Sequence, residues 1–260
     1  YIRKDLILQI DRKWFSELVR FGYPFIFTGL AFWLFGSMDR WMLAAFSNVE
    51  EVGIYSVAFR FSSLVLFVAN AIGMAWSPVA IKIKTDYPEI YREIYANILL
   101  VLLFIMLLIG STIALFSGEL ISFVMTADYA HSALPLIFLS FGIAIQTTQQ
   151  VTAIGISLEK KTYLFARVSW MTALLNLILN LLLIPRFGSL GAACATIISY
   201  LALTSGYLVY TQKLHPLPIN WKRLSVLILL GSILLLLSFQ LHCLEFNINI
   251  IAVKIFVMIG

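Results

Sequence analysis

Seven long apolar runs separated by short polar stretches dominate the pattern of hydrophobic and polar positions along this chain. The runs cover residues 21–46, 52–79, 94–116, 133–156, 163–184, 190–210 and 224–241. A helix needs about 20 residues to cross a hydrocarbon core of about 30 Å, so each run is long enough to span a membrane. None shows the alternation of barrel strands. The pattern therefore predicts an all-α membrane protein, a polytopic bundle of transmembrane helices.

The two ends of the chain depart from this pattern. In residues 1–20, apolar side chains recur at four-residue spacing with charges between them, which predicts an amphipathic helix along the membrane surface. An ordinary linker is the alternative. The last apolar run, 247–260, has 14 residues and is too short to span. Because the sequence also starts with Tyr1 and shows no signal peptide, we expect a truncated part of a larger transporter. Its bundle, 21–260, would hold seven full spans and one incomplete span.

The distribution of Lys and Arg between the predicted loops indicates the orientation of the spans. Charged residues make up 12% of the chain, against about 25% in an average soluble domain. The net charge of +5 would suit a nucleic-acid partner, but the basic residues alternate between loops, 13 against one. Membrane proteins keep basic loops in the cytoplasm, so residues 1–20 are expected there. The basic character is thereby explained, and we expect no nucleic acid.

Charged residues inside the complete spans are the main functional candidates, because a charge within the bilayer is costly and usually faces a cavity or a partner. Arg40 and Arg60 are predicted at similar depth on antiparallel neighbouring spans, where two guanidinium groups would bind an anion such as a phosphate. In the alternative, Asp39 neutralises Arg60 while Arg40 extends outward. Arg167, about one turn from the cytoplasmic end of its span, is a third substrate-binding candidate, although snorkelling to the interface explains it nearly as well.

Two groups of uncharged polar residues also lie inside predicted spans. Gln146 and Gln149 belong to a polar cluster in the fourth span, and Asn176 and Asn180 lie on one helical face of the fifth. Buried amides in lipid need hydrogen-bond partners. These residues therefore either line a polar path or join one helix to another, and both interpretations stay open.

No catalytic, cofactor or metal motif is present. The sequence has no phosphate-binding glycine loop, no H-E-x-x-H and no G-x-S-x-G. Its two cysteines form no C-x-x-C motif, and its three histidines are scattered in or beside loops. We therefore expect no enzyme, no cofactor and no metal site. A transporter without an ATP motif would use an ion gradient or run downhill.

Two stretches resemble a known superfamily. Residues 176–200, N-L-I-L-N-L-L-L-I-P-R-F-G-S-L-G-A-A-C-A-T-I-I-S-Y, resemble a segment of the MATE-like superfamily of multidrug exporters and polysaccharide flippases. There it forms a span, a tight outer turn and a closely packed second span. Residues 21–43, with G-S-M-D-R-W, and 52–60, V-G-I-Y-S-V-A-F-R, look like the start of the second half of polysaccharide flippases, including the O-antigen (Wzx-type) group. The resemblance covers essentially the whole chain.

This resemblance implies the second lobe of a two-lobed transporter, with residues 1–20 connecting it to a missing N-terminal lobe. It implies a flippase of the bacterial inner membrane that moves a polyprenyl-pyrophosphate-linked oligosaccharide for O-antigen and lipopolysaccharide biosynthesis. Arg40 and Arg60 would then face the pyrophosphate. Asp39 would couple transport to a proton or a sodium ion.

Three other interpretations are open. A MATE-type multidrug exporter carries organic cations and is expected to have acidic cavity residues, which disfavours it here. A peptidoglycan-precursor flippase is a near relative of the favoured interpretation. A non-transporting membrane partner of a glycan polymerase or chain-length machinery is a different class. In such a protein, Arg40 and Arg60 would point to lipid headgroups rather than into a cavity.

Overall fold

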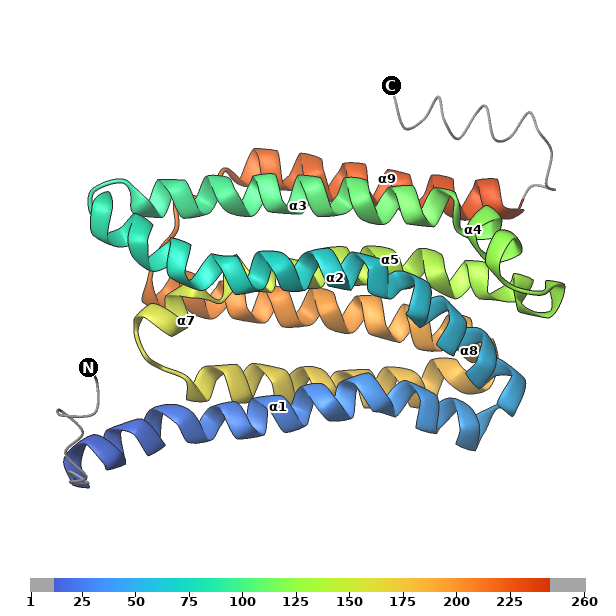
Figure 1. Cartoon of the computed structure of the whole chain (residues 1–260), viewed down its shortest axis with the longest axis horizontal. Helices are drawn as coiled ribbons and strands as arrows, with labels where there is room; N and C mark the ends of the chain where they lie inside the picture. Colours follow the sequence, from blue (N-terminus) through green and yellow to red (C-terminus); the bar gives the residue numbers. More distant parts are fainter. Residues whose placement is uncertain (1–11, 244–260) are drawn as a thin grey trace, which may run out of the picture.

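In the computed structural model, which describes residues 12–243, the chain is a bundle of helices that run back and forth along one axis (Figure 1). Every regular element in that part is helical, which confirms the predicted all-α membrane class. The first part of the predicted surface helix, residues 1–11, and the predicted incomplete span, 247–260, lie outside the described residues. The elements are α1 (Arg12–Phe46), α2 (Val49–Asp86), α3 (Tyr91–Leu115), α4 (Ser117–Val124), η2 (Ala127–Ser132), α5 (Ala133–Thr147), α6 (Gln149–Thr152), α7 (Ile154–Leu158), α8 (Tyr163–Leu214) and α9 (Trp221–Cys243).

Six helical segments of the described part are long and apolar enough to cross a membrane. They are Trp14–Phe46, Val49–Asp86, Tyr91–Leu115, Ala127–Leu158, Tyr163–Leu214 and Trp221–His242. The 52 residues of α8 are more than twice what one crossing needs, and the helix is interrupted at Gly188. Figure 1 shows its two halves side by side, running in opposite directions. The runs predicted over 163–184 and 190–210 correspond to these halves.

The reversal of α8 depends on two glycines. Gly188 has a φ of 53°, a left-handed conformation that residues with a Cβ atom rarely adopt. Gly191 lies so close to the first half of α8 that an added Cβ atom would be 2.5 Å from the Leu183 carbonyl oxygen. Small residues at such contacts let two membrane helices approach closely. The geometry is the tight turn and close packing that the resemblance implied for residues 176–200.

Two helix boundaries differ from the predicted runs. Residues 12–20 continue without a break into 21–46, so α1 is one helix of 35 residues. The run predicted over 133–156 is not one continuous helix. It divides into α5, α6 and α7, and the first interruption is at Thr148. The Thr148 hydroxyl donates to the Ile145 carbonyl oxygen over 2.7 Å, and local side-chain bonds of this kind compete with the regular helical pattern.

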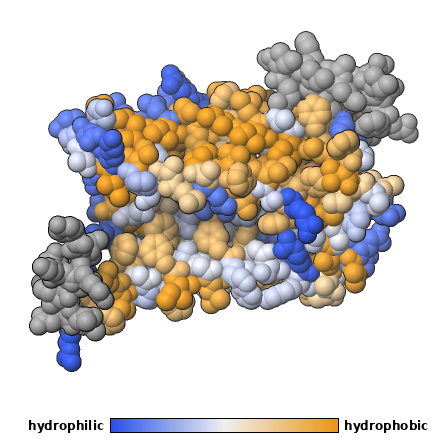
Figure 2. Space-filling view, viewed as in Figure 1, coloured by the Kyte–Doolittle hydropathy of each residue, from blue (hydrophilic) through white to orange (hydrophobic). Residues whose placement is uncertain are grey.

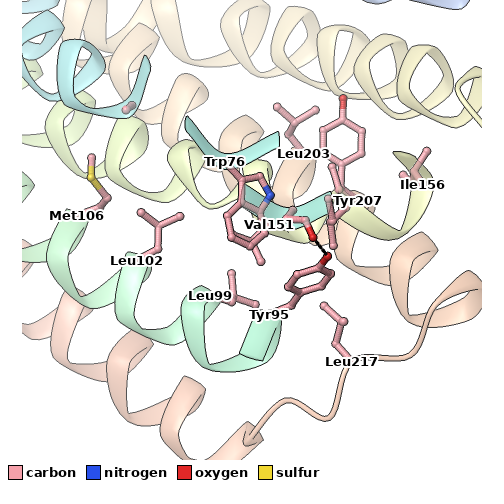
Figure 3. Packing of buried hydrophobic residues seen from close by; sticks show 14 of the residues in the cluster. Trp76, Tyr95, Leu99, Leu102, Met106, Val151, Ile156, Leu203, Tyr207 and Leu217 are labelled. Atoms are coloured by element: carbon pink, nitrogen blue, oxygen red, sulfur yellow. Dashed lines mark hydrogen bonds between the residues drawn. The ribbon is translucent and has the colours of Figure 1, made fainter. Parts of the chain in front are cut away.

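The interior and the exterior of the bundle are both largely apolar. Inside, α5 packs against α2, α3 and α8, and α1 packs mainly against α8. The largest core cluster surrounds Trp76, Tyr95 and Tyr207, where the Tyr95 hydroxyl donates to the Ala80 carbonyl oxygen over 2.5 Å (Figure 3). Outside, Phe67 is 77% exposed, and Figure 2 shows hydrophobic side chains over much of the visible face. So much exposed apolar surface fits contact with lipid.

The two ends of the bundle differ in charge. The start of α1, the end of α2, the starts of α3 and α8, the end of α8 and the start of α9 lie together at the left of Figure 1. We call this the basic end; Arg186 lies at the opposite end. The described basic residues of the basic end are Arg12, Arg20, Lys82, Lys84, Arg92, Lys160, Lys161, Lys213, Lys222 and Arg223.

Candidate functional site

A buried carboxylate, Asp39, joins α1 to α2 and to both halves of α8. The residue is 3% exposed. Its Oδ1 atom accepts a hydrogen bond from Asn180 Nδ2 over 2.6 Å. Its Oδ2 atom accepts from the hydroxyls of Tyr55, over 2.5 Å, and Thr196, over 3.0 Å. Four helical segments that are distant in the sequence therefore meet at one carboxylate.

Helical spacing brings a second asparagine into this cluster. Asn176 lies one turn before Asn180, whose Nδ2 atom also donates to Asn176 Oδ1 over 3.1 Å. Both asparagines are fully buried. Asn176 Nδ2 and Asn180 Oδ1 have no hydrogen-bond partner among the described residues. The cluster thus keeps a spare donor and a spare acceptor next to a carboxylate, which costs free energy in an apolar bundle.

The three donors around Asp39 match its ionised form, because an ionised carboxylate only accepts hydrogen bonds. Thr196 Oγ1 lies 3.0 Å from Asp39 Oδ2 and also 3.0 Å from the Ala192 carbonyl oxygen, and its single hydrogen serves one of them at a time. If Oδ2 gains a proton, Thr196 can donate to Ala192 and accept from Asp39. The cluster can therefore accommodate both protonation states without moving a helix.

Arg40 reaches the neighbouring helix α2 one residue away from Arg60. The Arg40 guanidinium carbon lies 4.7 Å from the centre of the Phe59 ring, and Phe59 directly precedes Arg60 on α2. Arg40 Nη1 also donates to the Gly36 carbonyl oxygen over 3.3 Å. Arg40 is half-buried and Arg60 is exposed on the surface of this bundle. A guanidinium held on an aromatic face by a cation–π contact has a restricted orientation.

Asp39 does not form an ion pair with Arg60 in the part of the chain that the structure describes. Its carboxylate is surrounded by neutral donors, and the positive charge of Arg60 is therefore not cancelled by the nearest buried acid. The structure thus differs from the alternative in which these two residues form a structural pair.

The remaining predicted site residues lie elsewhere. Arg167 is exposed on the first half of α8, and Gln146 is half-buried near the end of α5. Gln149 lines a cavity toward the basic end. Within residues 12–243, no group of three or more His, Cys, Asp or Glu side chains is placed to hold a metal ion.

Sequence reasoning missed three residues that the structure places in polar contacts. Tyr55 and Thr196 bind Asp39, and Glu51 Oε2 accepts a hydrogen bond from the Ser189 backbone N–H over 2.6 Å. Tyr55 does lie in the G-I-Y-S motif, which was a signal for it. Thr196 and Glu51 carry no such signal, because their partners meet them only through the reversal of α8.

The first 134 residues match the protein family described as "Polysaccharide biosynthesis protein". The chain is 25% identical over 201 residues to the probable low-salt glycan biosynthesis flippase Agl15 of Haloferax volcanii, covering 75% of this chain and 42% of that protein. It is 29% identical over 194 residues to the probable flippase AglR of the same organism, covering 72% of this chain and 37% of AglR.

A further relative is the capsular polysaccharide biosynthesis protein CapF of Staphylococcus aureus, 27% identical over 200 residues, with 76% of this chain and 50% of CapF covered. This chain therefore spans at most about half the length of these curated relatives. No solved structure gives a significant match.

Proposed function

Because this chain belongs to the polysaccharide biosynthesis protein family, we propose that it works in a flippase that moves a lipid-linked oligosaccharide between the leaflets of the cytoplasmic membrane. The chain is a multi-pass, flippase-like membrane protein of polysaccharide biosynthesis. The proposal adds the substrate, an oligosaccharide on a polyprenyl pyrophosphate, and the direction, from the cytoplasmic to the outer leaflet. O-antigen is one surface polysaccharide that such a transporter would serve.

The observation that carries the substrate proposal is the pair Arg40 and Arg60. The Arg40 guanidinium contacts Phe59, the residue before Arg60 on the neighbouring helix, and Asp39, which precedes Arg40, is bound to neutral donors instead. A pyrophosphate is an anion with several acceptor oxygens, and guanidinium groups bind such oxygens in pairs. The same feature disfavours an organic cation as substrate, because two arginines would repel it.

Asp39 is the proposed coupling residue. A buried carboxylate whose neighbour Thr196 can exchange hydrogen-bond partners is suited to take up and release a proton. The spare acceptor Asn180 Oδ1 gives the same cluster one further oxygen for a small monovalent cation. Since Asp39 touches α1, α2 and both halves of α8, a change in its charge would act on all of them.

Each of these curated relatives is at least about twice as long as the part of it that aligns with this chain. We place the transport path between this bundle and a second lobe, which rock against each other between inward-open and outward-open states. A glycan polymerase would act on the product at the outer leaflet.

Transport by the full-length protein, with this bundle and its second lobe together in sealed vesicles, tests the proposal. Fluorescent lipid-linked oligosaccharide loaded in one leaflet should reach the other faster with the protein than in protein-free vesicles, and a pH or sodium gradient should change the rate. Asp39→Asn should remove the effect of the gradient. Equal rates with and without the protein, under every gradient, would contradict a flippase.

A further inference from the structure

A second polar feature lies toward the basic end, separate from the arginines. A cavity of about 270 Å³ opens between α1, α2, α6, α7 and α8. Aromatic rings form much of its wall, and between them lie amide and hydroxyl groups. The aromatic residues are Phe25, Phe32, Trp76, Phe165 and Tyr207, and the polar residues are Thr28, Ser77, Gln149, Gln150 and Ser157.

No lysine, arginine, aspartate or glutamate lines this cavity. A pyrophosphate would therefore find no counter-charge in it. Trp76 Nε1 and Gln149 Oε1, both on lining residues, are buried and have no hydrogen-bond partner among the described residues. Unpaired buried polar groups are costly, and a ligand that bonds to them recovers that cost.

The aromatic wall is held in place by its own contacts. The Phe165 ring lies 5.7 Å from Phe25 and 5.5 Å from Tyr207, measured between ring centres. The Tyr207 hydroxyl is 2.8 Å from Ser169 Oγ. Trp76 packs edge-on against Tyr95 at 5.5 Å, in the cluster that Figure 3 shows. These rings are therefore set before any ligand arrives, which lowers the entropic cost of binding.

A glycine makes room for the amide of Gln150. A Cβ atom on Gly73 would lie 2.7 Å from Gln150 Nε2 and 3.0 Å from its Cδ atom. Gln150 is half-buried and lines the cavity together with Gly73. The absence of a side chain at Gly73 thus lets the amide lie across α2 at the cavity wall.

We propose that this cavity binds one neutral pyranose ring of the lipid-linked glycan. A pyranose ring offers apolar C–H faces to aromatic rings, while its hydroxyls both donate and accept hydrogen bonds, as amides do. The cavity is slightly smaller than the usual ligand pocket of about 300–1,000 Å³, which suits a single ring. Its place toward the basic end, the predicted cytoplasmic side, puts it where the substrate enters. This inference rests on the proposed function and concerns a different part of the substrate from the arginines.

Saturation-transfer NMR on the protein in nanodiscs tests the site directly. The probes are glucose, galactose, mannose, rhamnose, N-acetylglucosamine and N-acetylgalactosamine, unlinked to lipid. At least one should receive saturation at its ring C–H protons. In Gln149→Leu/Gln150→Leu the affinity should fall about tenfold, because two hydrogen bonds are lost. Trp76→Phe, which keeps a ring and removes the N–H, should weaken binding less.

The controls separate this site from the arginines. Gln146→Leu changes a nearby glutamine that does not line the cavity and should bind as wild type does. Gly73→Ala, which displaces only the end of the Gln150 side chain, should weaken binding in a folded protein. Arg40→Gln should bind sugar normally, and inorganic pyrophosphate should not displace it.

Two outcomes overturn the site: no transfer to any of the six sugars, or equal binding by wild type and the double glutamine variant. The glycan transport assay then tests the proposed function independently of this site. A protein that transports lipid-linked glycan but shows either outcome is a flippase without this subsite. Sugar binding without glycan transport by the full-length, two-lobed protein would leave the cavity assigned and refute the flippase.

Discussion

The Tyr55 hydroxyl lies 2.5 Å from Asp39 Oδ2 with both residues buried, whereas Tyr207, equally buried, pairs with the neutral Ser169 hydroxyl over 2.8 Å. Tyr55→Phe should lower the free energy of unfolding by about 1.5–3 kcal/mol and Tyr207→Phe by about 0.5–1.5 kcal/mol, because bonds to charged groups are stronger. Unfolding in detergent measures both. In an Asp39→Asn background the Tyr55→Phe effect should shrink, and an unchanged effect would show that the charge is not what Tyr55 binds.

Replacing Arg40 or Arg60 separates anion binding from folding. Arg→Gln at either position should reduce glycan export about tenfold or more, because a bond to a charged group is lost. Arg→Lys should retain part of the activity, since the charge stays and the planar fork is lost. Export is normalised to folded protein in the membrane.

Abundance should stay normal in Arg60→Gln, because Asp39 has other partners. If Asp39→Asn/Arg60→Gln exports as wild type does, the anion site is wrong.

The reversal of α8 should tolerate no side chain at its two glycines. Gly188→Ala should cost about 1–3 kcal/mol of stability, because its φ is strained and the Cβ atom would meet Glu51 Oε2 at 2.6 Å. Gly191→Ala meets backbone at 2.5 Å, so the helices must separate. Gly36→Ala, with open space around it, is the matched control and should stabilise by about 0.5–1 kcal/mol. Equal melting temperatures for the three variants would refute this account of the turn.

His215, just after α8, should make stability depend on pH. Burial lowers its pKa below the ordinary 6.5, as do Arg92 and Lys84, while Glu159, with Oε1 3.7 Å from His215 Nδ1, partly offsets this. The folded state therefore disfavours the proton. The contribution of neutral His215 to stability should be fully present above pH 6.5. It should be lost as the pH falls from there toward the folded-state pKa.

Melting temperatures between pH 7.5 and 5 would show this loss, and His215→Gln should flatten it. A profile that is equally steep in His215→Gln would assign the loss to other groups.

Cysteine labelling checks the orientation. In a background without Cys194 and Cys243, a cysteine at Asn48 or Ala127 should react with an impermeant thiol reagent added outside cells. One at Thr85 or Lys161 should react only after permeabilisation, because those sites belong to the basic end. All four positions are exposed, so burial does not confuse the result. External labelling at Lys161 would reverse the topology.

The sequence pattern predicted the helices well and the site only in part. Apolar runs of bilayer length have few structural solutions, so the spans and their alternating charge were readable. Asn176 and Asn180 were found because helical spacing places them on one face. The bond from Asn180 to Asp39 could not be predicted, because the register between α1 and α8 depends on packing. Thr196 reaches Asp39 only because the chain reverses at Gly188. Hydrophobic periodicity shows where helices lie but not which residues meet after such a reversal.

Glu51 and Ser189 lie at the end opposite the basic end, and Asp39 joins its four helical segments nearer to that end than to the basic one. These contacts restrict the helices near that end, so a tilt of α1 would displace its other end the most. Thr28 lies eleven residues before Asp39 on α1, about 16 Å along the axis, so a tilt of α1 by about 10° moves it by about 3 Å. Small rearrangements around the carboxylate would thus be magnified toward the basic end.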